Sequence, residues 1–167
     1  MTAVLQDKPN RTTEVIMKNI FLAIVLVSIL NGCATVPLAD KQESSRSKAF
    51  SAPADGRAGL YIYRTGGFGA ALKKDLWIDG RCVGESAPEV FFYEEVDGDR
   101  EHTISTESEF SPNSLKLTTA SGKNYFVRQY IKMGLFVGGA NLRLVSEAEG
   151  EAQVRRLDMA NKGTCSR

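Results

Sequence analysis

Apolar and polar residues alternate with a period of two along much of the chain beyond residue 57, the pattern of half-buried β-strands. Turn residues separate eight such segments: 60–63, 76–78, 81–83, 90–93, 102–105, 115–118, 125–132 and 141–145. The pair Asp79-Gly80 gives the strongest hairpin signal, because a type I′ turn needs positive φ at both central residues. Residues 147–159 are rich in helix formers. Residues 57–167 therefore predict a mainly β fold, an antiparallel β-sandwich of about seven or eight short strands with a short C-terminal helix.

Aromatic residues occupy both faces of two predicted strands. Leu60 and Ile62 share one face of the first strand, and Tyr61 and Tyr63 share the other. The run Phe91-Phe92-Tyr93 has the same property. The pattern favours a second covered sheet face, and the alternative is an exposed platform on which sugars stack.

Residues 17–32 have the organisation of a secretory signal. Lys18 supplies a positive charge, and an uncharged apolar run of eleven residues follows at 20–30. Eleven helical residues rise about 16 Å, roughly half of the ~30 Å hydrocarbon core of a bilayer. The run therefore predicts a cleaved signal peptide and not a permanent transmembrane helix.

The tetrapeptide Leu30-Asn31-Gly32-Cys33 resembles the lipobox of bacterial lipoproteins. That resemblance implies a diacylglycerol on the Cys33 sulfur, cleavage just before it and acylation of the new amino terminus. Several acyl chains hold a protein stably on a membrane, whereas one chain binds only marginally. Because Ala34 is not aspartate, the sorting rule of enteric bacteria implies the periplasmic face of the outer membrane, with the inner membrane as the alternative where sorting differs. An ordinary signal with an accidental cysteine is the competing interpretation.

Three segments precede or begin the mature chain. Residues 1–16 carry four charges ahead of the signal, which indicates a gene-start error with translation beginning at Met17, or else an unusually long positive region. Residues 1–32 are therefore excluded from the fold. Residues 33–56, with two prolines and four serines, are predicted to be the lipidated cysteine and a flexible tether that reaches about 25–30 Å.

Composition excludes a collagen, a disordered chain and a protein that crosses a membrane many times. Of 167 residues, 43% are hydrophobic and 25% are charged, as expected for a globular domain. The mature chain from Cys33 to Arg167 holds 18 basic and 18 acidic residues. This balance argues against nucleic acid as a partner and against a polybasic lipid-binding patch.

Chemistry-bearing residues are sparse, and the sequence indicates no catalytic residue, metal site or cofactor. His102 is the single histidine, and no serine or cysteine signature of a hydrolase accompanies it. The spacings of common zinc motifs are missing, and the glycine-rich segments at 66–69 and 134–139 match neither the dinucleotide fingerprint nor the P-loop. Six acidic residues are candidates for paired carboxylates, with solvated turns as the favoured interpretation: Glu94, Glu95, Asp97, Asp99, Glu107 and Glu109. Asp97 and Asp99 are also considered for calcium, but the full twelve-residue loop pattern is missing.

Cys82 and Cys165 remain once Cys33 is acylated. Export to an oxidising compartment permits a disulfide between them, which would close a loop of more than eighty residues. The chain-entropy model assigns such a bridge about 4 kcal/mol. Two free thiols are the equal alternative.

Several segments, in order, resemble a family of small bacterial envelope lipoproteins catalogued as a domain of unknown function: 60–64, 77–80, 101–104, 122–128, 134–138 and 144–147. The resemblance spans about residues 57–158 and implies a β-sandwich and a lipid anchor, but no catalytic residues. The expected function is a lipid-anchored, non-enzymatic binding or structural module facing the periplasm, with an envelope protein as partner. The alternatives are a glycan- or peptidoglycan-binding module and, less favoured, a hydrolase that uses His102.

Overall fold

The computed structural model describes residues 16–17, 20, 33–163 and 165–166. The chain divides into two units, Met1–Gly32 and Cys33–Arg167, of which the second is the folded domain. Nearly all of the predicted signal, including residues 21–30 of the apolar run and lipobox residues 30–32, lies outside the described residues. Within the described part, no helix combines the length and the apolar character that crossing a membrane requires.

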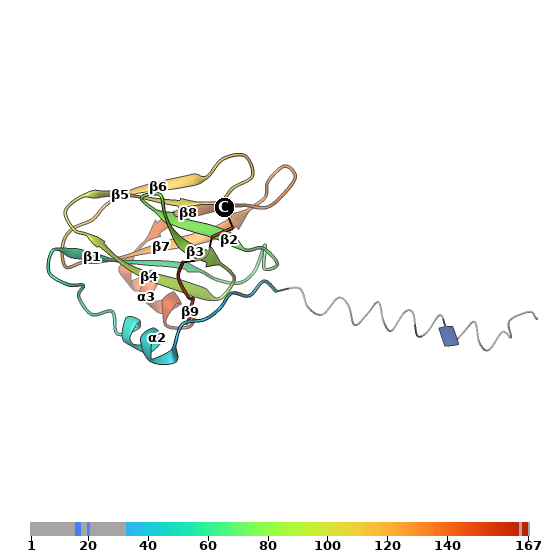
Figure 1. The fold of residues 1–167 in the computed structure, drawn as a ribbon, viewed down its shortest axis with the longest axis horizontal. Helices are drawn as coiled ribbons and strands as arrows, with labels where there is room; N and C mark the ends of the chain where they lie inside the picture. Colours follow the sequence, from blue (N-terminus) through green and yellow to red (C-terminus); the bar gives the residue numbers. More distant parts are fainter. Residues whose placement is uncertain (1–15, 18–19, 21–32, 164, 167) are drawn as a thin grey trace, which may run out of the picture. The chain divides into compact units, whose positions relative to one another are not determined.

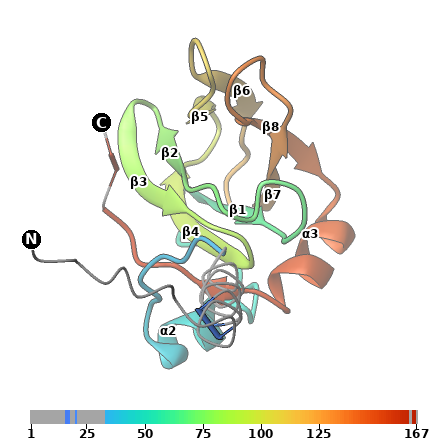
Figure 2. The same cartoon turned by 90° about the vertical axis from the view of Figure 1, so that its right-hand side faces the viewer.

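Across the described residues, nine strands form two sheets, which confirms the mainly β sandwich (Figure 1). One sheet has the order β8-β7-β1-β4-β9, and the other has the order β3-β2-β5-β6. The strands are β1 (Arg57–Arg64), β2 (Lys74–Ile78), β3 (Arg81–Ser86), β4 (Val90–Asp97), β5 (Glu101–Thr106), β6 (Asn113–Thr118), β7 (Asn124–Lys132), β8 (Gly139–Val145) and β9 (Asp158–Met159). Within the described part of the folded domain, two short helices, α2 (Lys41–Ser47) and α3 (Glu147–Val154), lie on the side of the five-stranded sheet (Figure 2).

The main hydrophobic core lies between the two sheets. The five-stranded sheet contributes Leu60, Ile62 and Val127, and the four-stranded sheet contributes Ile78 and Ile104, all at most 1% exposed. These positions repeat every second residue along their strands, so the alternation read from the sequence marks the faces that meet.

A second hydrophobic cluster covers the other face of the five-stranded sheet. Tyr61 and Phe126 stack with ring centroids 4.9 Å apart, and Val154 of α3 packs against this cluster. Gly150 permits the close approach of α3, because a Cβ there would come within 2.1 Å of the Phe126 ring. The preferred interpretation of the two-faced aromatic strands, a second covered sheet face, is confirmed.

Strand direction and the C-terminal helix differ in detail from the sequence prediction. Two strand pairs are parallel, β1 with β7 and β4 with β9, because the chain crosses to the other sheet between their members. Helix α3 ends at Val154, not Met159, because Leu157 and Met159 are buried in the second cluster and Asp158–Met159 joins the sheet as β9.

The predicted hairpin turn between β2 and β3 is present. Asp79 and Gly80 have φ values of 50° and 77°, as a type I′ turn requires. Asp79 also bonds to the neighbouring strand, since its backbone N–H donates to the Thr103 carbonyl at 2.9 Å.

Candidate functional site

Cys33, the predicted site of acylation, begins the folded unit. Its thiol is exposed and forms no disulfide. The next residue is already fixed to the domain, because the Ala34 N–H donates to the Ala70 carbonyl in the loop between β1 and β2 at 2.9 Å. Cys33 therefore lies on the domain surface, beside that loop.

The segment after Cys33 packs on the domain, unlike the flexible tether expected for residues 33–56. Leu38 forms an isolated β-bridge with Ala160, and the Ala39 N–H donates to the Met159 carbonyl at 2.8 Å. Helix α2 follows, capped by the Asp40 carboxylate, which accepts from the Gln42 N–H at 2.7 Å.

Phe50 also attaches the segment that follows Cys33 to the domain. Its ring packs edge-on against Tyr61 and Phe126, at centroid distances of 5.3 and 5.8 Å. The sequence pattern missed the attachment because a seven-residue helix carries too little periodicity to stand out and depends on packing for its stability. The prediction that residues 33–56 form a flexible tether reaching about 25–30 Å is therefore wrong.

The structure joins Cys82 and Cys165 in a disulfide, with their Cα atoms 6.1 Å apart. The next residue is held as well, because the N–H and hydroxyl of Ser166 both donate to the Asp75 carboxylate, at 2.9 and 2.7 Å. The sequence left open whether these two cysteines form a disulfide or remain free thiols, and the structure shows the disulfide.

His102 is buried, with 3% of its surface exposed, and both ring nitrogens are engaged. Nε2 lies 2.8 Å from the Asp97 carbonyl and donates to it, because a carbonyl oxygen only accepts; Nδ1 lies 2.6 Å from the Asp79 carboxylate. This carboxylate also accepts from the Thr103 N–H at 2.9 Å. The ring joins the β2–β3 turn to β4 and β5, which is a structural arrangement.

The ionisation of Asp79 reflects that environment. Desolvation opposes its charged form, but the hydrogen bonds from the Thr103 N–H and His102 outweigh it. They hold the pKa of Asp79 below its ordinary value.

The other candidate carboxylates have separate partners. Glu94 pairs with Lys162 at 3.0 Å, and Glu95 accepts from the Tyr93 hydroxyl at 3.0 Å. Asp97 pairs with arginines, Asp99 accepts from the Ser121 hydroxyl at 2.6 Å, and Glu107 lies 3.9 Å from Lys74. Among the described residues no group of three histidine, cysteine or acidic side chains is placed to hold a metal ion.

Glu109 binds the backbone of the second glycine-rich segment. Its carboxylate accepts from the N–H groups of Leu135, Phe136 and Val137 in the β7–β8 loop. Desolvation opposes the charge, but these three hydrogen bonds hold the pKa of Glu109 below its ordinary value. The backbone N–H groups of this glycine-rich segment, a segment type that can bind phosphate, therefore bind a carboxylate of the same chain.

The two tyrosines of β1, on which a sugar platform would depend in part, are covered. Tyr61 and Tyr63 are each 1% exposed, and the Tyr61 hydroxyl donates to the Ser47 carbonyl at 2.8 Å. Trp77 is partly exposed on the outer face of the four-stranded sheet. Tyr61 and Tyr63 thus offer no exposed face to a sugar, and Tyr93, Tyr125 and Tyr130 are each only partly exposed.

Sequence reasoning missed a set of exposed apolar side chains in three loops: Phe68, Phe110, Met133, Leu135, Phe136 and Val137. The available signal was Leu135-Phe136-Val137, three apolar residues in succession between the glycines of a turn, where polar residues are usual.

Comparison with known proteins places the chain in a family. Residues 54–140 match the model of a protein family described as "Protein of unknown function (DUF2846)". A protein of Haemophilus influenzae described as "Uncharacterized protein" is 52% identical over 147 residues, which cover 86% of this chain and 87% of that protein. No solved structure matches. The chain therefore belongs to the DUF2846 family of proteins of unknown function.

Proposed function

We propose that this protein is a bacterial envelope lipoprotein, acylated at Cys33 and facing the periplasm from the outer membrane. The observation that carries the proposal is the apolar run at 20–30, whose last residue begins the tetrapeptide Leu30-Asn31-Gly32-Cys33. The exposed thiol of Cys33 at the start of the folded unit supports it, because a lipid attached there would not have to enter the core.

The domain acts as a non-enzymatic binding or structural module whose partner is an envelope protein. His102 and the acidic candidates are engaged in hydrogen bonds and ion pairs within the domain, which supports this role over hydrolysis. The Cys82–Cys165 bridge supports export, because disulfides persist in oxidising compartments.

The test is the intact mass of the native protein extracted from membranes. The expected species starts at Cys33, carries the added mass of acyl chains and gains the mass of two hydrogens on reduction. A Cys33→Ala variant should lose the acyl mass and accumulate with its leader attached. The matched control, with serine replacing both Cys82 and Cys165, should keep the acyl mass. An unmodified Cys33 in the native protein would refute the anchor.

A further inference from the structure

Three long connections meet at one end of the sandwich, here named the loop end. They are the β1–β2 loop (65–73), the β5–β6 loop (107–112) and the β7–β8 loop (133–138). The six apolar side chains noted above lie on these loops, and each is between 55% and 84% exposed. Such a concentration of exposed apolar surface is unusual for a soluble protein and marks a contact site.

Hydrogen bonds and close packing fix the three loops together. Glu109 of the β5–β6 loop accepts from Leu135 N–H, at 2.6 Å, and from the next two N–H groups of the β7–β8 loop. The buried guanidinium of Arg64 donates to the Leu72 carbonyl at 2.7 Å and to that of Gly69, which fixes the β1–β2 loop. A Cβ on Gly138 would come within 2.7 Å of Leu72, so the β1–β2 and β7–β8 loops are in contact.

Cys33 lies at the same end. Ala34 is hydrogen-bonded to Ala70, two residues from Phe68, and consecutive Cα atoms are only about 3.8 Å apart. An acyl chain attached to Cys33 therefore leaves the domain beside the β1–β2 loop. The packed segment that follows Cys33 leaves no slack with which the domain could stand away from the bilayer.

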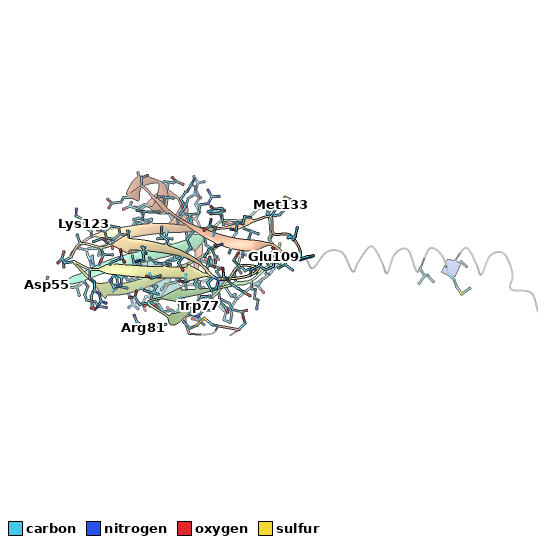
Figure 3. The ribbon with its side chains drawn as sticks, turned by 90° about the horizontal axis from the view of Figure 1, so that it is seen from above. Asp55, Trp77, Arg81, Glu109, Lys123 and Met133 are labelled. Atoms are coloured by element: carbon cyan, nitrogen blue, oxygen red, sulfur yellow. A yellow bond between two sulfur atoms is a disulfide. The ribbon has the colours of Figure 1, made fainter. Side chains whose placement is uncertain are left out.

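The opposite end, here named the turn end, is polar. It is formed by the short connections at 79–80, 98–100 and 119–123, with residues 54–56 before β1. Figure 3 shows Asp55 and Lys123 at this end and Glu109 and Met133 at the other. Of the exposed large apolar side chains in the described part of the domain, all but Leu38 and Leu144 thus lie at the end that carries Cys33.

We propose that the loop end is a second membrane contact, in which the apolar loop side chains enter the interface of the phospholipid bilayer that holds the acyl chains of Cys33. This proposal rests on the proposed acylation of Cys33. Apolar side chains typically enter such an interface by about 5–10 Å and strengthen binding in proportion to the apolar area they bury. The sandwich then stands upright, with the turn end directed away from the membrane.

Two further features suit the loop end to a bilayer. Backbone N–H groups without partners are costly in a low-dielectric medium, and Glu109 already satisfies those of Leu135, Phe136 and Val137. Lys132, the exposed last residue of β7, places a positive charge beside the β7–β8 loop, where anionic headgroups would lie.

The experiment measures quenching of tryptophan fluorescence by lipids brominated on their acyl chains. The mature acylated protein, which starts at Cys33, is reconstituted into vesicles of phosphatidylcholine and phosphatidylglycerol, with native Trp77 as the internal reference. A Phe136→Trp variant adds an indole at the loop end, and the matched Lys123→Trp variant adds one at the turn end. Both replaced side chains are exposed, so neither change disturbs the core.

We expect brominated lipid to remove roughly half of the emission that Phe136→Trp adds and almost none of that from Lys123→Trp, because only the first indole enters the interface. Equal, weak quenching in both variants would overturn the membrane contact. Shielding of the Phe136→Trp indole from aqueous acrylamide without quenching by brominated lipid would indicate a protein contact and would also overturn it. The intact mass of the protein in the same sample shows whether Cys33 is acylated. This measurement distinguishes these outcomes from a failure of the anchor itself.

Discussion

Connections at the turn end are two to five residues long and are held by polar side chains, whereas three of those at the loop end are six to nine residues long and expose apolar ones. Both ends use a carboxylate to bind backbone N–H groups: Asp79 accepts from Thr103, and Glu109 accepts from three consecutive residues. At the turn end the bonded residues belong to strands and tight turns, so the bonds add to the stability of the sandwich. At the loop end they order a segment whose side chains remain outside the core. The difference indicates that one end serves folding and the other serves contact.

Removing the Cys82–Cys165 disulfide should destabilise the fold strongly, and this loss of stability is the reference for changes made at either end. Replacing Cys82 and Cys165 with serine should lower the free energy of unfolding by about 4 kcal/mol, because the bridge closes a loop of 83 residues in the unfolded chain. Urea denaturation of the oxidised wild type and the double variant measures this. If wild type with reductant retained its full stability, the bridge would be dispensable.

His102→Ala should be the most damaging single change at the turn end. We expect a loss of about 2–3 kcal/mol, because it removes the His102 hydrogen bonds to one oxygen of Asp79 and to the Asp97 carbonyl, which keeps only the Thr119 hydroxyl, and opens a cavity. Urea midpoints measure it, with Lys123→Ala at the same end as the control that should stay close to wild type. A loss no larger than that of the control would remove the contrast between the two ends.

Asp79→Asn tests whether charge contributes to the turn end. Because the pKa of Asp79 is held below its ordinary value, its ionised form stabilises the fold above about pH 4, and this contribution disappears as the pH falls through the folded pKa. We expect the variant to be less stable at pH 6 by up to about 1 kcal/mol, a modest value since the site is partly solvated. The gap to wild type should narrow near pH 3, and a gap independent of pH would exclude the ionic contribution.

Phe136→Ser should have the smallest effect on stability. The side chain is 81% exposed, so the free energy of unfolding should change by less than about 0.5 kcal/mol. Phe126→Ala, which truncates a phenylalanine buried beneath α3, should cost about 3–5 kcal/mol in the same urea assay. A loss of several kcal/mol for Phe136→Ser would mean that the loop end is part of the folding core.

The alternation of apolar and polar residues determined strands β1–β8 and the two buried faces of β1, and the pair Asp79-Gly80 determined the positive φ values of the turn. These features depend on neighbours within a few residues, so they could be read along the chain. The apolar run and the tetrapeptide ending at Cys33 are likewise local, which is why the anchor was predicted from sequence and remains a proposal.

Only the tertiary structure decided the features that join distant parts of the chain. Leu38 meets Ala160, Cys82 meets Cys165, and Glu109 meets Phe136, and no local pattern encodes any of these pairs. The parallel pairing of β1 with β7 has the same origin, because it depends on where the intervening strands cross to the other sheet. Alternation specifies which face of a strand is buried, whereas the partner of each face follows from the path of the whole chain.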